Sequence, residues 1–222
     1  MVANSARMTL ETLQEAWSPY RDTSRPPPKP VLLGQVGTRT IYLNNEWGPP
    51  IPYPPALHED GTENHGYTRL KGSGASIALI PEVRGWPEYQ AFLEAINGDA
   101  SPIESVGCEK AYFPKHDGVV RVYLGSYTDI MFSERALNND ATNSLRLASQ
   151  LAASLEGCER WWSSAEFAIQ RMKWISGCTC PWGLMVKVGG RGRDEAEARR
   201  TWSASMDRLT ECIRHLPADW SQ

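Results

Sequence analysis

A strand followed by a long amphipathic helix near the C-terminal end constrains the fold of this 222-residue chain more than any other sequence feature. Residues 182–188 are mostly apolar and predict a strand. Asp194-Glu-Ala-Glu197 is typical of a helix start. A helix is predicted from there to Pro217, because apolar residues recur with the spacing of one helical face: Ala198, Trp202, Met206, Leu209, Ile213 and Leu216.

Further helices and strands interleave irregularly along the chain. Apolar stripes and start signals predict helices at residues 9–17, 86–97, 140–156 and 163–175, the last from a Ser163-Ser-Ala-Glu166 capping box. Strands are predicted at residues 31–36, 40–44, 74–79, 103–113, 119–124 and 127–132, with tight turns at Gly37-Thr38 and Gly125-Ser126. Hairpin-linked neighbours favour an α+β fold, a largely antiparallel sheet with helices packed on one face.

Prolines concentrate in the N-terminal third of the chain. Arg25-Pro-Pro-Pro-Lys-Pro30 and Gly48-Pro-Pro-Ile-Pro-Tyr-Pro-Pro55 predict extended polyproline segments, because proline fixes φ and removes a backbone donor. We therefore expect two parts. Residues 1–66 form a Pro-rich N-terminal segment with a short helix and a hairpin, and this segment wraps over a main α+β domain of residues 67–222.

Composition excludes several classes of protein. The apolar runs are far shorter than the roughly 20 residues of a membrane span, so no membrane partner is expected. The net charge is −3, and this lack of basic excess disfavours nucleic-acid binding. The N-terminus lacks the apolar core of a secretory signal, which indicates a cytoplasmic protein. Five cysteines, an odd number, favour free thiols over a disulfide framework.

The loop from His58 to His65 gathers the most reactive side chains. Its two imidazoles stand beside the carboxylates of Glu59, Asp60 and Glu63, which are ligand types that divalent metals accept. The two histidines are seven residues apart in a turn-rich loop, so the spacing matches no helical metal motif. A solvated acidic loop is the simpler interpretation, and we expect no metal and no cofactor.

Other candidate catalytic residues are scattered along the sequence. Cys178-Thr-Cys180 has neither the second cysteine pair of a zinc site nor the spacing of a redox motif, and buried packing is commoner for free cysteines. His116 lies in a predicted turn beside Asp117. If the chain is an enzyme, we expect a small-molecule hydrolase or transferase with a cleft under the Pro-rich segment, lined by His58, His65, His116, Asp129 and Cys180.

A glycine-rich run, Gly189-Gly-Arg-Gly-Arg-Asp194, joins the C-terminal strand to the last helix. Backbone N–H groups there, with Arg191 and Arg193, could bind an anion. The run matches neither phosphate-loop pattern, and Glu195 and Glu197 already occupy the positive helix end. Glycines required by a tight turn are the favoured explanation of the run.

Nine tryptophans are more than core packing alone usually requires, and Trp47 lies in a polar loop flanked by prolines. With Tyr53, Glu59, Asp60 and Glu63 it forms a predicted acidic-aromatic recognition surface, since rigid aromatic side chains lose little entropy on docking. The alternative is that Trp47 folds back over the sheet edge. We favour a non-catalytic cytoplasmic binding protein of the immunity or inhibitor type, whose partner is another protein. The enzyme stays the alternative.

Overall fold

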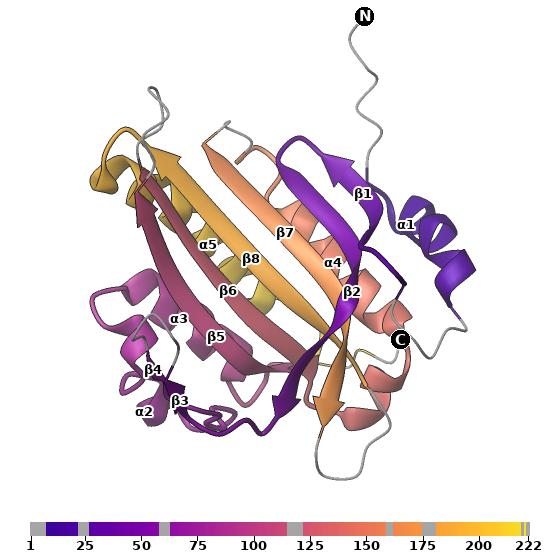
Figure 1. Cartoon of the computed structure of the whole chain (residues 1–222), viewed down its shortest axis with the longest axis horizontal. Coiled ribbons are helices and arrows are strands. Elements are labelled where there is room, and N and C mark those ends of the chain that lie inside the picture. Colours follow the sequence, from indigo (N-terminus) through magenta and orange to yellow (C-terminus); the bar gives the residue numbers. More distant parts are fainter. Residues whose placement is uncertain are drawn as a thin grey trace, which may run out of the picture.

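The computed structural model of the chain describes residues 8–21, 27–57, 63–114, 122–158, 162–174, 181–218 and 220. A six-stranded mixed sheet forms its centre, in the order β1-β2-β7-β8-β6-β5 (Figure 1). Neighbouring strands are antiparallel except β2 and β7, which are parallel. The strands are β1 (Val31–Val36), β2 (Arg39–Ile51), β5 (Ile103–Pro114), β6 (Val122–Phe132), β7 (Ser163–Trp174) and β8 (Trp182–Gly192).

Helices cover one face of this sheet, so the predicted α+β class is confirmed. Figure 1 shows α3, α4 and α5 behind the strands, with α1 beside β1. A short ribbon of β3 (Ala56–Leu57) and β4 (Glu63–Asn64) lies with α2 near the β5 edge. The helices are α1 (Leu10–Trp17), α2 (Gly74–Ile77), α3 (Pro87–Asn97), α4 (Ala141–Ser154) and α5 (Glu195–Arg214), and single 3-10 turns occupy Ser18–Tyr20, Pro81–Val83 and Arg135–Asn139.

The core lies between the helices and the covered face of the sheet. Trp202 and Met206 of α5 share one buried cluster with Leu145 of α4, Phe167 of β7 and Val186 of β8. This is the apolar stripe that the sequence predicted for the last helix, and the predicted cap is confirmed because the Asp194 carboxylate accepts from the N–H of Glu197 at 2.8 Å. The helices lie against one face of the sheet, which we call the helix side. We call the opposite face of the sheet the uncovered face.

The predicted helix at residues 163–175 is wrong, because this segment is β7. Ala165, Phe167 and Ile169 alternate toward the helices, and β7 pairs with β2 on one side and β8 on the other. The Ser163 hydroxyl donates to the carbonyl oxygen of Cys158 at 2.8 Å rather than capping a helix. Pairing with two neighbouring strands and burial of one face stabilise the strand more than a helix cap would stabilise a helix here, because a cap contributes only about 1 kcal/mol.

The predicted turn at Gly125-Ser126 is also wrong, since β6 runs through it. A side chain at Gly125 would meet the ring of Tyr123, with a Cβ only 2.7 Å from Cε1. Ser126 lies on the helix side, where its hydroxyl accepts from the indole N–H of Trp202 at 3.0 Å. Gly125 thus serves close packing within a strand, and Ser126 serves a contact with α5.

Two further expectations at the proline-rich and glycine-rich segments need correction. Residues 74–79, predicted as a strand, contain the single helical turn α2, with Ile77 buried. Residues 48–51, predicted as polyproline, form the end of β2, where Ile51 pairs with Trp174. The predicted wrap of the whole Pro-rich segment stays a prediction, because residues 22–26 and 58–62 lie outside the described residues. Strands β1 and β2 form one side of the same sheet as β5–β8.

Within the described ranges, no helix has both the length and the apolar character needed to cross a membrane.

Candidate functional site

A groove of about 580 Å³ follows the edge strand β5. Six consecutive residues of that strand, from Ser105 to Lys110, line it. Residues of the loop between Tyr53 and Leu70, which carries β3 and β4, form one wall, and Ile80, Pro81 and Glu82 also line the groove. Tyr127 and Asp129 of the neighbouring strand β6 complete the lining. We call this feature the β5 groove.

The tyrosine-rich loop wall is held in shape by its own backbone. The N–H of Tyr67 donates to the carbonyl oxygen of Tyr53 at 2.9 Å, and the two rings contact edge to face with centroids 6.2 Å apart. Gly66 has φ of +82°, and its N–H donates to the Asn64 side-chain oxygen at 2.9 Å. A Cβ at Gly66 would lie 2.8 Å from the backbone nitrogen of Pro55, so this tight return requires glycine.

Buried contacts fasten the same loop to the sheet. Tyr67 packs on a small apolar cluster formed by Ile51, Val106, Met131 and Met172. Beside it, the buried carboxylate of Glu104, 1% exposed, forms an ion pair with Arg135. The guanidinium of Arg69, from the loop, lies 3.9 Å from the same carboxylate. The wall is therefore a packed part of the fold.

A buried carboxyl group, Asp129, lies at the base of the β5 groove. It is 3% exposed, and its Oδ1 accepts from the Gln170 side-chain amide at 2.9 Å. The Gln170 side-chain oxygen in turn accepts from Asn44 at 3.0 Å. Burial raises the pKa of Asp129 to about 7, although the Gln170 hydrogen bond and Lys187 act against this.

Gly107 lies opposite Asp129 in the β5–β6 ladder and has no side chain to place beside that carboxyl. A Cβ at Gly107 would lie 3.1 Å from Asp129 Oδ2 and 3.7 Å from the hydroxyl oxygen of Tyr53. The carboxyl and the phenol therefore converge over the backbone of β5. Burial raises the pKa of Tyr53 to about 12, with smaller contributions from Cys108 and Asp129.

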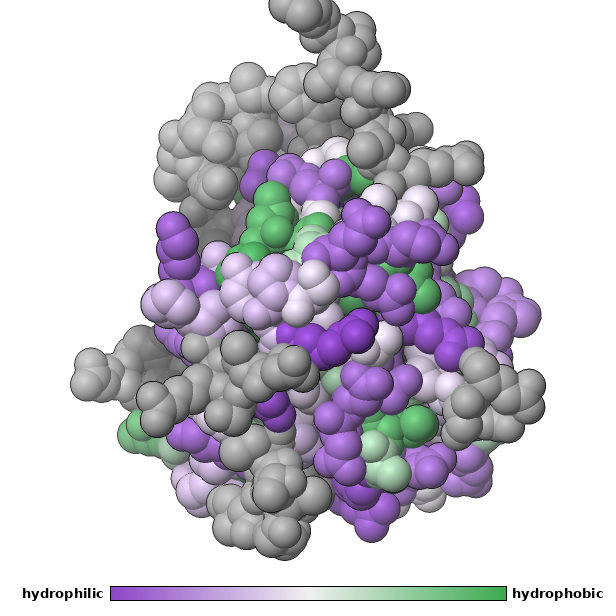
Figure 2. Space-filling view, turned by 90° about the vertical axis from the view of Figure 1, so that its right-hand side faces the viewer, coloured by the Kyte–Doolittle hydropathy of each residue, from purple (hydrophilic) through white to green (hydrophobic). Residues whose placement is uncertain are grey.

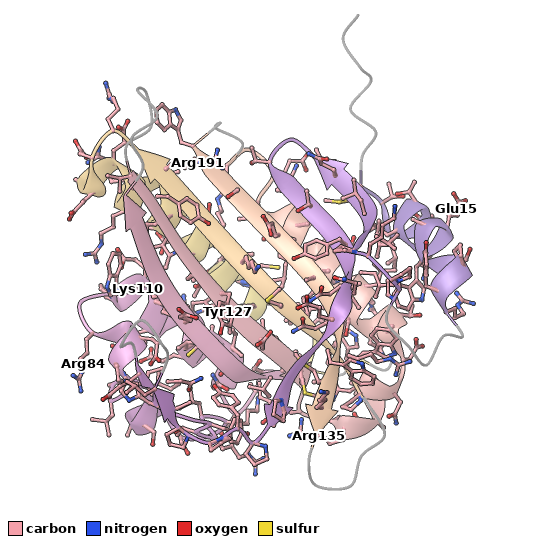
Figure 3. The ribbon with its side chains drawn as sticks, in the orientation of Figure 1. Glu15, Arg84, Lys110, Tyr127, Arg135 and Arg191 are labelled. Atoms are coloured by element: carbon pink, nitrogen blue, oxygen red, sulfur yellow. The ribbon has the colours of Figure 1, made fainter. Side chains whose placement is uncertain are left out.

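The lining of the β5 groove is acidic. Its four carboxyl groups are those of Glu63, Glu82, Glu109 and Asp129, and its basic side chains are those of His65 and Lys110. Lys110 turns to the helix side, where its ammonium lies 4.1 Å from the centre of the Trp86 ring. Burial, and then Arg199, lower the pKa of Lys110. Figure 3 shows Lys110 and Tyr127 along the β5 and β6 strands.

The surface at the other edge of the sheet, around α1 and β1, lies far from the β5 groove in the strand order. Figure 2 shows the side with α1 and β1, where the described residues are mostly hydrophilic and hydrophobic ones lie in separate patches. Leu32 of β1 is 58% exposed. The two other strongly exposed leucines in the described part of the chain, Leu57 and Leu79, are next in sequence to the groove residues Ala56 and Ile80.

The structure brings together four of the candidates that the sequence singled out. Tyr53, Glu63, His65 and Asp129 all line the β5 groove. The ring nitrogen Nδ1 of His65 lies 4.0 Å from the carboxylate of Glu63. The remaining five candidates of the loops lie outside the described residues: His58, Glu59, Asp60, His116 and Cys180.

Trp47 does not belong to the groove lining. It lies on β2, in register with Arg171 of β7, and its side chain is half-buried. Its neighbour Gly48 faces Met172 and Gln170 on the uncovered sheet face. Because side chains alternate along a strand, Trp47 is directed away from that face.

The glycine-rich run before α5 is explained by packing. Gly190 and Gly192 belong to β8, and a Cβ at Gly190 would lie 2.5 Å from the backbone nitrogen of Trp202. Arg193 is bound to Glu197, with Nε 3.0 Å from Oε2 and its backbone N–H donating to the same oxygen at 2.9 Å. Arg191, which is labelled in Figure 3, belongs to β8 and pairs with Tyr123 of β6. The glycines therefore serve close packing of β8 on α5 in place of the predicted tight turn, and anion binding by Arg191 and Arg193 stays a prediction.

Several groove residues were missed by the sequence analysis, namely Tyr67, Glu82, Glu109 and Tyr127. Tyr127 and Asp129 share one face of β6, and Glu109 lies opposite Tyr127 in the ladder. The alternating polar residues on this strand pair were the available signal.

The three described cysteines, Cys108, Cys158 and Cys212, are free thiols, as predicted. Within the described part of the chain, no group of three or more metal-ligating side chains is placed to hold a metal ion.

Comparisons of the chain with protein families, curated proteins and solved structures found no match.

Proposed function

We propose that this chain is a non-catalytic binding protein of the immunity or inhibitor type, which recognises another protein through the β5 groove. The observation that carries the proposal is the acidic-aromatic lining, in which four carboxyl groups and the rings of Tyr53, Tyr67 and Tyr127 share one groove. Tyrosines give rigid contact area at low entropic cost, and a surplus of one charge selects partners of the opposite charge.

The surroundings of the groove favour a protein over a small metabolite. Leu57 and Leu79 are 71% and 73% exposed, and each is next in sequence to a groove residue. Exposed apolar side chains beside a polar groove are typical of interaction sites, where their burial contributes about 25 cal/mol per Å². The groove wall is anchored by buried groups, so the site is largely formed before binding, which reduces the entropy lost on association.

A hydrolase or transferase is the second candidate, and one observation favours it. The pKa of Asp129, raised to about 7 by burial, suits a general acid or base. Against this, Asp129 and His65 are the described members of the expected catalytic set. Asp129 is hydrogen-bonded to Gln170, whereas His65 lies beside Glu63. The binding protein therefore accounts for more of the lining than the enzyme does.

The test uses three forms of the full chain as baits in lysate from the source organism. They are the wild type, the groove variant Glu82→Lys/Glu109→Lys, and the matched control Glu15→Lys/Glu156→Lys. Glu15 and Glu156 are exposed and lie outside the groove, and both variants change the charge equally. Partners retained by wild type and control are identified, produced recombinantly and titrated with each bait.

We expect one stoichiometric protein partner whose affinity falls at least about 100-fold with the groove variant and changes less than about 3-fold with the control. If that partner is a toxin or enzyme, equimolar chain should inhibit it. Equal retention by wild type and groove variant would contradict the use of the groove, and absence of any stoichiometric partner would contradict the binding function. Turnover of a hydrolase or transferase substrate, abolished by Asp129→Asn, would favour the second candidate.

A further inference from the structure

Strand β5 is an edge strand, and its outer side determines what the groove can hold. In the described ranges β6 is its sheet neighbour on one side, and the sheet ends at β5 on the other. The first part of this edge is already satisfied within the chain. The N–H of Ser105 donates to the Asn97 side-chain oxygen at 3.0 Å, and the carbonyl oxygen of Ile103 accepts from the ammonium of Lys71 at 2.9 Å.

Beyond Ser105 the edge borders the groove itself. The strand is irregular between Ser105 and Gly107, and from there residues up to Lys110 line the groove. An unpaired strand edge presents alternating N–H and C=O groups, which are a template for another strand. The loop wall and Ile80–Glu82 line the same groove of about 580 Å³, so this edge adjoins a space that a further segment could enter.

Strand β5 presents different side chains on its two faces, and a strand bound to its edge would contact both faces. Gly107 and Glu109 face the uncovered sheet side with Asp129 and Tyr127. Cys108 and Lys110 alternate with them, and Lys110 reaches Trp86 on the helix side. Alternate side chains of a bound strand would therefore meet an acidic-aromatic row on one side only.

We propose that the groove takes an extended segment of a protein partner that adds to β5 as a further strand and carries lysine or arginine at alternate positions. This rests on the protein-binding function proposed above and specifies how the partner is recognised. Charge complementarity carries the choice of occupant, because Glu63, Glu82 and Glu109 surround the edge while the ammonium of Lys110 is engaged with Trp86. Main-chain hydrogen bonds supply affinity in this binding mode, and alternate side chains supply specificity.

The partner residue that pairs with Gly107 is expected to be the most selective one. Gly107 has no side chain, and the hydroxyl of Tyr53 and the carboxyl of Asp129 converge over its backbone. A long basic side chain from the partner strand fits here, since its aliphatic part can pack on the half-buried ring of Tyr53 while its charge approaches the exposed carboxylate of Glu109 on the same face of β5. The partner residue at this position is therefore expected to be basic.

The experiment selects peptides from a phage-displayed library of random linear decapeptides on the immobilised full chain. Selected peptides are synthesised and titrated against wild type, Glu82→Lys/Glu109→Lys and Glu15→Lys/Glu156→Lys. Two N-methylated versions of the best peptide are added, each methylated on alternate residues so that one strand edge cannot donate hydrogen bonds. Amide hydrogen exchange of the chain is followed with and without the unmethylated peptide.

We expect selected peptides with basic residues at alternate positions, and a dissociation constant at least about 30-fold higher for the groove variant than for the control variant. Exchange should slow at residues 106–110. One methylated version should lose binding while the other keeps it, because one edge of the peptide faces β5. Binding should also weaken when NaCl is raised from about 50 to about 500 mM.

Several results would overturn the strand-addition proposal. These are recovery of no peptide, peptides without basic residues, protection confined to other segments, or equal tolerance of both methylated versions. Its failure is distinguishable from failure of the proposed function. A stoichiometric partner that loses binding to the groove variant, without protection of residues 106–110, would retain the function and reject this mode. Selected strands without a stoichiometric partner would support the mode and reject the function.

Discussion

The side-chain amide of Gln170 on β7 donates a hydrogen bond to the buried carboxyl of Asp129 on β6, with Nε2 2.9 Å from Oδ1. Strand β8 separates these two strands, so the bond spans the uncovered face of the sheet. Lys187 of β8 also favours the charged form of Asp129. Burial outweighs both effects, and the pKa of Asp129 rises from 3.8 to about 7.

The first prediction concerns the pH dependence of stability at Asp129. The folded chain holds this proton more strongly than the unfolded chain between pH values near 4 and 7, so the carboxyl group contributes a stability that falls as pH rises through that window. From pH 5 to pH 8 this loss is about 3 kcal/mol at most, because about two pKa units of the window lie in this range. Asp129→Asn removes this titratable carboxyl group, so the variant should not show this fall in stability. At pH 8 the variant should therefore be more stable than the wild type. Urea denaturation at both pH values measures the difference.

The control for this prediction is Asp99→Asn, which changes an exposed carboxylate. Its stability should follow the wild-type pH profile, because this change leaves the buried carboxyl group of Asp129 in place. The titratable groups whose charge interacts with that of Asp129, which are Lys187, Tyr53, Tyr127 and Cys108, are retained in both variants. A pH profile for Asp129→Asn that is parallel to wild type would refute the assignment of the raised pKa.

The second prediction concerns the ion pair of Glu104 and Arg135 beneath the groove wall. Glu104 is 1% exposed, so Arg135→Ala leaves a buried carboxylate without its closest cation. The free energy of unfolding should fall by about 3 kcal/mol, as for other buried pairs that lose one member. Thermal or chemical denaturation gives the value. Arg69→Ala is the comparison, because that side chain is 70% exposed and 3.9 Å away, and it should cost less than about 1 kcal/mol.

A double variant separates the charge effect from packing at this pair. Glu104→Met/Arg135→Met removes both charges and keeps apolar volume, so it should regain stability to within about 1 kcal/mol of the wild type. A double variant as unstable as Arg135→Ala would show that the charge of Glu104 is not what the arginine offsets.

Sequence patterns predicted the elements whose stability comes from one amphipathic face. The stripe from Ala198 to Ile213 on α5 and the Gly37 hairpin between β1 and β2 were found because local spacing determines them. β7 was misassigned because Ser163 and Glu166 match a helix cap locally. What places this segment in a strand is pairing with β2 and β8, and the β2 partners lie more than a hundred residues away.

The candidate site was predicted only in part for a similar reason. Tyr53, Glu63 and Asp129 attracted attention through residue type, yet nothing local relates Tyr53 to Asp129. Their approach depends on the tight return at Gly66 and on the β5–β6 register that places Gly107 opposite Asp129. Glu109 borders the groove because β5 is an edge strand, and that position of β5 follows from the strand order of the whole sheet.

The third prediction concerns Gly66 in the groove wall. Gly66→Ala places a side chain at φ of +82° and brings its Cβ within 2.8 Å of the Pro55 backbone nitrogen. The loop must shift, so binding of a selected basic peptide should weaken about 10-fold while most of the core is retained. Isothermal titration measures the loss. Gly157→Ala is the matched control, since Gly157 has φ of +84° with open space around it, and it should bind the peptide like wild type.

The fourth prediction concerns the close contact between β8 and α5. A Cβ at Gly190 would lie 2.5 Å from the backbone nitrogen of Trp202, and neither backbone can move without opening the buried cluster around that indole. Gly190→Ala should therefore lower the free energy of unfolding by about 3 kcal/mol or more, the upper range for overpacking. Gly74→Ala provides the comparison, because nothing lies within 4 Å of its added Cβ, and its stability should change by less than about 1 kcal/mol. Urea denaturation of the two variants side by side decides the matter, since equal stabilities would mean that α5 does not pack on β8 through these glycines.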